Sequence, residues 1–241
     1  LGTLIHSVGQ LIAHQLDLFV TRERDGYKPG LFQRVIGTNI PKARLLYYLS
    51  DREMEEFGYE QHESMDTQSE RKDGWCGWHN DHSALTGLAL GMFFDAQGGV
   101  VRDIVSYGDG GLYIKTRENV THQLAVNEEQ AEKYLAFQIG ETSQILSAGA
   151  LVATPHAVMA YRGESARQIS RASFAVFHQP HHDLSMTAPY HEGVRVEDIQ
   201  FDRFLPPSVP TLSSRWWNAT HDTFGQFSTR TFETYYDMKM K

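Results

Sequence analysis

The chain has 241 residues, of which 41% are hydrophobic and 12% aromatic, a composition that excludes intrinsic disorder and allows one domain with a substantial core. Its formal net charge of −8 argues against nonspecific nucleic-acid binding, because phosphate contacts need clustered Lys and Arg. No apolar run approaches the roughly 18 residues that a membrane span requires, so we expect no membrane partner. The single cysteine, Cys76, excludes an intrachain disulfide and is typical of a reducing compartment, which favours the cytoplasm.

The first part of the chain predicts a helix followed by a strand. Residues 3–22 have apolar side chains at a period of about 3.6 residues, typical of an amphipathic helix that packs on a sheet. These apolar positions are Leu4, Ile5, Val8, Leu11, Ile12, Leu16 and Phe19. We expect His6 and His14 to be incidental surface residues. Residues 43–49 predict a strand, and the polar residues 51–72 indicate a loop or short helix over a site entrance or, equally, a solvated loop.

Beyond residue 75 the pattern changes to short strands separated by Gly-rich turns, which predicts a mainly β fold with two sheets. The expected strands are residues 84–94, 100–105, 111–115, 123–125, 135–139, 151–153 and 172–178. A final helix at 231–238 is expected to close one face. We expect a single domain over residues 1–241. Its parts are N-terminal helix and strand support (1–72), a core with the functional site (73–180) and a C-terminal loop and helix (181–241).

Residues 75–88 place an imidazole and a carboxylate two positions apart, at His79 and Asp81. On an extended strand, alternate side chains share a face, so the two would point the same way. Two such ligands and one further His make the facial triad that holds non-haem Fe(II) and leaves coordination positions open. His-x-Asp alone is common by chance, and by itself it favours a polar surface turn over a metal site.

Further candidates follow downstream. A turn at Gly149 and an extended segment lead into His156, which supplies a third ligand. Arg171 and Ser173 then alternate along a strand whose other members are apolar. A guanidinium and a hydroxyl on one strand face suit a carboxylate, although Arg171 alone could be a structural salt-bridge partner. The order His-x-Asp, His, Arg-x-Ser is far more specific than any one part.

In this order the sequence resembles the iron(II)/2-oxoglutarate-dependent oxygenases, in particular the isopenicillin N synthase-like branch of plants and algae. The resemblance is carried by His79-Asn80-Asp81-His82-Ser83-Ala84-Leu85-Thr86, by His156 with its lead-in and by Arg171-Ala172-Ser173. Weaker matches at residues 42–48, 111–114 and 224–227 extend it over nearly the whole chain. The sequence also departs from the family. Leu46 replaces its usual Asn, the interval from Asp81 to His156 implies an insertion around 96–110, and residues 162–165 lengthen the next interval.

The resemblance implies a double-stranded β-helix (jelly-roll) core with flanking helices. It implies that His79, Asp81 and His156 bind Fe(II), and that Arg171 and Ser173 bind the distal carboxylate of 2-oxoglutarate, which Tyr48 also touches. The implied enzyme uses O2 to decarboxylate 2-oxoglutarate to succinate and CO2 while it oxidises a small organic substrate by hydroxylation, desaturation or cyclisation. We expect a monomer. Because the family carries a further N-terminal region before this point, we also expect a longer natural protein.

Three alternatives to this function stay open. The chain could be a related Fe(II) oxidase that does not use 2-oxoglutarate, a catalytically silent metal-binding module, or a hydroxylase of protein side chains. A second metal site is conceivable in the His-rich residues 178–183. We expect a loop there, because Pro180 interrupts the run and no further ligands accompany it. His82 should point away from Asp81 and not share the iron.

Overall fold

The structure is a computed structural model that describes residues 1–37, 40–59, 74–104, 110–124, 133–161, 166–187, 196–216 and 222–239. Its centre consists of two antiparallel four-stranded sheets, with strand orders β1-β8-β3-β6 and β2-β7-β4-β5. The strands are β1 (Lys42–Tyr48), β2 (Gly74–His79), β3 (Leu85–Phe94), β4 (Gly111–Lys115), β5 (Thr121–Leu124), β6 (Leu135–Ile139), β7 (His156–Met159) and β8 (Ser170–His178). Except between β4 and β5, each successive strand changes sheet. This confirms the expected mainly β fold with a double-stranded β-helix core.

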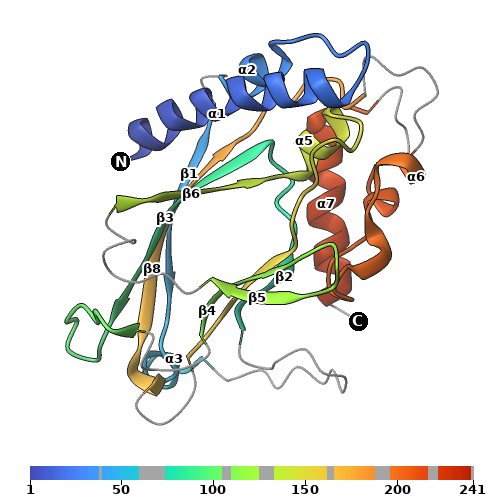
Figure 1. Cartoon of the computed structure of the whole chain (residues 1–241). Coiled ribbons are helices and arrows are strands. Elements are labelled where there is room, and N and C mark those ends of the chain that lie inside the picture. The colour runs from blue at the N-terminus through green and yellow to red at the C-terminus, as the bar shows by residue number, and fades with distance from the viewer. Residues whose placement is uncertain are drawn as a thin grey trace.

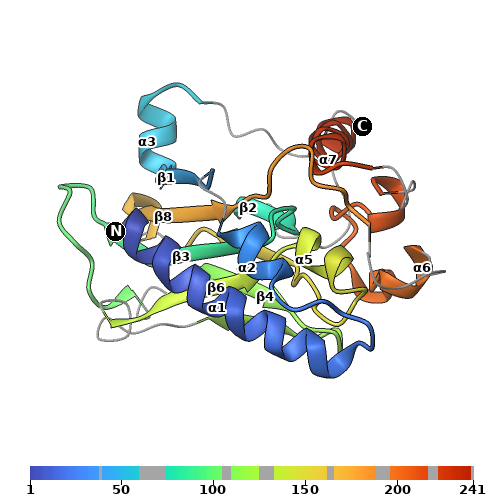
Figure 2. The same cartoon turned by 90° about the horizontal axis from the view of Figure 1, so that it is seen from above.

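Helices flank this core (Figure 1). The α-helices are α1 (Gly2–Glu23), α2 (Leu31–Ile36), α3 (Asp51–Glu56), α5 (Glu141–Leu146), α6 (Val196–Ile199) and α7 (Phe224–Lys239). Short 3-10 helices lie at Ala166–Gln168, Asp202–Phe204 and Leu212–Ser214. Seen from above, α1 lies across the sheet that contains β3 and β8, and α7 stands at the other side of the molecule (Figure 2). No helix in the described part of the chain is long and apolar enough to cross a membrane.

The predicted first helix exists, and Ile5 is buried as expected, but the rest of its fully buried stripe differs from the expected one. Its buried residues are Ile5, Gly9, Ala13, Asp17 and Val20. Leu4 and Leu11 are 56% and 70% exposed, so their predicted packing on the sheet is wrong. The helix approaches β8 through small residues: a Cβ on Gly9 would lie 2.6 Å from His178 Nε2. His6 is not incidental either, because its ring stacks on that of His178 with centroids 5.3 Å apart.

Most predicted strands are present to within a few residues, and two predictions are wrong. In the predicted strand 100–105, pairing stops after Val101 N donates to Phe93 O, and residue 105 lies outside the described residues. Residues 151–153 are not a strand, and β7 begins only at His156. The backbone N–H groups of Leu151 and Ala153 instead donate to side chains of α5 and the residue after it, a helix that the sequence did not predict.

The polar segment 51–72 begins with the short helix α3. Ser50 Oγ accepts from Glu53 N, and the Glu53 carboxylate accepts from Ser50 N, which is a capping box. Residues 60–73 and 162–165 lie outside the described residues. The expected insertion corresponds to the long connection between β3 and β4, of which residues 105–109 are also outside them.

Candidate metal centre

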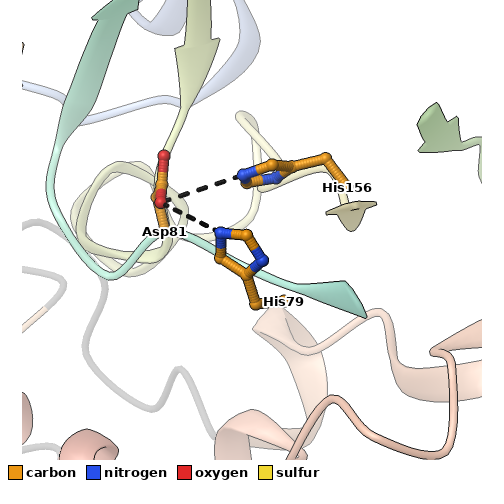
Figure 3. A group of neighbouring side chains, drawn as sticks. All are labelled: His79, Asp81 and His156. Carbon is orange, nitrogen blue, oxygen red and sulfur yellow. Dashed lines mark ion pairs between the residues drawn. The ribbon is translucent and has the colours of Figure 1, made fainter. Parts of the chain in front are cut away.

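Three side chains from distant parts of the chain converge between the two sheets. His79 ends β2 and faces His156, which begins β7, as its cross-strand partner. The Nε2 atom of each imidazole lies 3.9 Å from Asp81 Oδ1, and both rings turn toward this carboxylate (Figure 3). One ligand atom from each of the three residues lies within 4.8 Å of the others. We call these three residues the metal group.

Asp81 reaches the group in a different way from the one predicted. Strand β2 stops at His79, so Asp81 lies in the turn before β3 and not on the strand face that it was expected to share. The turn bends the chain inward, and Asp81 is only 8% exposed. The sequence therefore predicted which side chains come together, but from an approximate local geometry.

Hydrogen bonds prepare both imidazoles to bind a cation. His79 Nδ1 lies 2.8 Å from Gly77 O, and His156 Nδ1 lies 3.1 Å from Thr154 O. A carbonyl oxygen only accepts, so each Nδ1 carries the hydrogen. The lone pair of the neutral ring is then on Nε2, the atom that faces Asp81.

Asp81 presents one oxygen to the group and uses the other for support. Its Oδ2 accepts from Thr86 Oγ1 at 2.6 Å and from Gln138 Nε2 at 2.5 Å, which leaves Oδ1 toward the imidazoles. Gln138 Nε2 also lies 3.0 Å from His156 Nε2. Sequence reasoning missed Gln138, although a polar residue inside the apolar strand β6 is a signal. Two nitrogens and one oxygen, from side chains whose other nitrogen or oxygen is fixed by a hydrogen bond, fit a divalent transition metal such as Fe(II).

The electrostatics of the metal group also favour a cation. Burial works against charge on Asp81, but the two imidazoles and the bonds from Thr86 and Gln138 hold its pKa below the ordinary value. Burial and the neighbouring His79 lower the pKa of His156 to about 4. Burial opposes protonation of His79 too, yet Cys76, Asp81 and the Gly77 carbonyl together raise its pKa to about 9. Near neutral pH His79 therefore carries one proton beside Asp81, and a metal ion bound to the group would replace this proton as its cation.

A second group, which we call the anion anchor, consists of Arg171, Ser173 and Tyr48. Arg171 and Ser173 lie on β8, and Tyr48 is the cross-strand partner of Arg171 on β1. Arg171 Nη1 donates to Ser173 Oγ at 3.3 Å, and its guanidinium lies 5.3 Å from the centroid of the Tyr48 ring. Phe93 of β3 lies on the guanidinium as well, at 5.9 Å. The structure thus brings all three predicted residues together.

The guanidinium of Arg171 is buried without an opposite charge. Arg171 is 8% exposed, and no carboxylate in the described part of the chain pairs with it. Burial lowers its pKa, as expected for a cation removed from water. Gly91 makes room for the group, because a Cβ there would lie 2.5 Å from Arg171 Nε. A buried cation with hydroxyls beside it is suited to an anionic ligand.

Cys76 connects the metal group with the anion anchor. Its Sγ lies 3.7 Å from His79 Nδ1, and it is near enough to Tyr48 and Arg171 to shift the pKa of each side chain. Both groups therefore face the same space between the sheets.

The rival histidines do not form a site. As expected, His82 turns away from Asp81. Its Nε2 lies 3.1 Å from Ser228 Oγ of α7. His181 pairs only with Asp183 at 3.3 Å, and both are exposed. In the residues that the structure describes, no other three His, Cys, Asp or Glu side chains gather closely enough to hold a metal ion.

No model of a known protein family matches the sequence, and no curated protein matches it either. Among solved structures, a Caulobacter crescentus protein described as belonging to the 2OG-Fe(II) oxygenase family matches with a TM-score of 0.55 and 16% identity, over 96% of this chain and 56% of that one. A Shewanella oneidensis protein described as an oxygenase matches with a TM-score of 0.49 and 17% identity, over 76% of this chain and 56% of that one. The chain thus spans about half the length of these structures. At these identities the likeness is one of fold, and the fold of this chain is that of the Caulobacter 2OG-Fe(II) oxygenase family protein.

Proposed function

We propose that this protein is a non-haem Fe(II)/2-oxoglutarate-dependent dioxygenase that oxidises a small organic substrate and converts 2-oxoglutarate to succinate and CO2. The observation that carries the proposal is the combination, in one interior space, of a two-His, one-Asp metal group with a buried arginine that no carboxylate among the described residues pairs with. Fe(II), when bound, supplies the redox chemistry and the open coordination positions that O2 activation requires. The protein residues supply binding, orientation and exclusion of water.

Each residue of the two groups then has a definite task. His79, Asp81 and His156 hold the metal, and with one carboxylate and two neutral imidazoles around a divalent ion the net charge stays near +1, which favours an anionic cosubstrate. Arg171 offers its planar pair of donors to the distal carboxylate of 2-oxoglutarate, while Ser173 and Tyr48 add hydroxyl donors. The rings of Tyr48 and Phe93 shield this ion pair from water and so strengthen it.

The anion anchor also bears on the alternatives. A silent metal-binding module or an oxidase without a cosubstrate does not need a buried guanidinium available to bind an anion. Arg171 therefore favours the 2-oxoglutarate-dependent enzyme. We further propose that the enzyme is isopenicillin N synthase-like, that residues 1–241 form one oxygenase domain, and that the protein acts as a monomer in the cytoplasm. The order His-x-Asp, His, Arg-x-Ser supports the family branch, and the single cysteine supports a reducing compartment.

The test is anaerobic reconstitution of the protein with Fe(II) and 2-oxoglutarate. We expect a visible charge-transfer absorption band that needs both components, and succinate formation once O2 and a pool of candidate small molecules are added. Absence of the band at saturating 2-oxoglutarate, with Fe(II) demonstrably bound, would leave only an oxidase or a metal-binding module. Absence of Fe(II) binding would end the proposal altogether.

A further inference from the structure

The turn that carries Asp81 is held from outside the sheets by the C-terminal helix. We call residues 80–84 the metal turn. The backbone N–H of Asn80, between the two ligands His79 and Asp81, donates to the Tyr235 hydroxyl of α7 at 3.2 Å. The ring of His82 stacks on Phe224 with centroids 6.0 Å apart, at the start of the same helix. Helix α7 therefore contacts the metal turn at more than one point.

Helix α5 holds the metal turn by donating hydrogen bonds to the carbonyl oxygens of the turn. Three successive residues of α5 donate to three carbonyls of the turn. The bonds run from Glu141 N to Asp81 O (2.8 Å), from Thr142 Oγ1 to His82 O (2.7 Å) and from Ser143 Oγ to Ala84 O (2.7 Å). The approach is so close that a Cβ on Gly140 would lie 1.9 Å from Ser83 O. Any shift of α5 therefore moves the metal turn.

A buried ion pair joins α5 to the C-terminal segment. Arg215 is 0% exposed and donates to both carboxylate oxygens of Glu141, at 2.5 and 2.6 Å, and to Pro210 O at 3.0 Å. Glu141 Oε1 also accepts from Asn80 Nδ2 at 3.1 Å. Removing two charges from water costs several kcal/mol, and a well-packed apolar pair is often as stable. Stability alone therefore does not account for Glu141 and Arg215, whereas a fixed position of Asn80 does.

We infer that Arg215 and Tyr235 are positioning residues of the metal centre. Arg215 fixes the Glu141 carboxylate, and Glu141 and Tyr235 together hold the two N–H donors of Asn80, which sets the angle at which His79 and Asp81 face each other. The C-terminal segment that was expected to be a covering loop and helix is thus part of the metal site. This inference rests on the proposed metal binding, and it adds two residues that touch neither metal nor cosubstrate.

The experiment measures Co(II) binding to the whole chain by calorimetry, and the absorption spectrum of the bound Co(II), which reports its coordination geometry. For Arg215→Met we expect a dissociation constant raised about tenfold or more, as for other residues that orient metal ligands, and an altered spectrum. For Tyr235→Phe, which removes one hydrogen bond, we expect a rise of about two- to tenfold. The double change Arg215→Met with Glu141→Met should regain thermal stability but not Co(II) affinity, because Asn80 Nδ2 has lost its acceptor.

Asp17→Asn is the matched control. Asp17 is also a buried carboxylate that accepts several hydrogen bonds, from Phe32 N and Gln33 N among others, but it joins α1 to α2. The Asp17→Asn substitution should lower the stability of the protein and leave its Co(II) affinity and spectrum unchanged. Wild-type affinity and spectrum in both Tyr235→Phe and the double variant would overturn the inference, even if Arg215→Met failed to fold. A wild-type protein that binds no Co(II) would instead overturn the proposed function on which it depends.

Discussion

Two short segments of this chain are rich in histidine and aspartate, and only one of them contributes to a metal group. His79 and Asp81 turn toward a common point that His156 also reaches. In the other segment the side chains diverge: His178 is buried under α1, whereas His181 and Asp183 are 68% and 88% exposed at their side chains. The number of possible ligands in a segment therefore predicts little about metal binding. What matters is whether the backbone directs their side chains toward a common point.

The comparison is sharper at the level of single atoms. His178 Nδ1 donates to Leu85 O at 3.2 Å, as Nδ1 of His79 and His156 donate to carbonyls, so in all three neutral rings Nε2 carries the lone pair. In the metal group Nε2 faces Asp81. Nε2 of His178 is buried without a hydrogen-bond partner among the described residues. In this chain, an imidazole with its lone pair on Nε2 belongs to the metal group only where that nitrogen faces a carboxylate.

The largest effect that this comparison predicts follows from the third ligand. His156→Ala should weaken Mn(II) or Fe(II) binding by more than about 100-fold, because loss of a ligand exceeds the roughly 10- to 100-fold loss caused by residues that only orient ligands. His181→Ala should leave the affinity and the stoichiometry of one ion unchanged. Metal analysis after dialysis, together with calorimetric titration, measures both variants. Equal losses in the two would show that the His178–Asp183 segment binds metal after all.

The next effect concerns Arg171, a buried cation that pairs with no carboxylate in the described part of the chain. Arg171→Met should raise the dissociation constant of 2-oxoglutarate about 10- to 100-fold, the value of a hydrogen-bonded charge, without changing metal affinity. Arg44→Met is its control, because the Arg44 guanidinium is exposed and lies on the Phe177 ring, not on the Tyr48 and Phe93 rings that cover Arg171. Calorimetry with the Mn(II)-loaded protein measures the constant. Should Arg171→Met bind 2-oxoglutarate as the wild type does, the guanidinium has a structural role and the cosubstrate binds elsewhere.

Sequence reasoning was most successful where the chemistry lies in the side chain and weakest where a residue acts through the backbone. It selected His79, Asp81, His156 and Arg171 by residue type, and the structure gathers the first three and buries the fourth. It placed Asp81 on a strand, because alternation along the chain does not reveal where a strand ends. It predicted a strand at residues 151–153 because their competing partners, side chains of α5 and the residue after it, become neighbours only on folding.

Supporting residues were missed for the same reason. Gln138 and Arg215 are far in sequence from the ligands that they support, and nothing local marks them apart from a polar side chain among apolar neighbours. The burial of Gly9 and Ala13 on α1, in place of Leu4 and Leu11, likewise depends on how closely the helix approaches β8. The periodicity of apolar residues predicted the length of α1 but not which of its faces packs on the sheet.

The smallest predicted effect returns to the histidine that is not a ligand. Burial, with the neighbouring His6, lowers the pKa of His178 from the ordinary value of 6.5, although the Leu85 carbonyl partly opposes the change. The unfolded chain therefore binds a proton at His178 at a higher pH than the folded protein does. The contribution of His178 to the free energy of unfolding is complete above pH 6.5 and declines as the pH falls below it, by at most about 1.4 kcal/mol per pH unit.

His178→Asn keeps an N–H donor for Leu85 O and cannot be protonated, so its free energy of unfolding in urea should fall less between pH 7 and pH 5 than that of the wild type. His82, whose pKa burial also lowers, is present in both proteins and cancels in the difference. Parallel pH profiles for the two proteins would mean that His178 takes up its proton without cost, and that the buried Nε2 finds an acceptor on protonation.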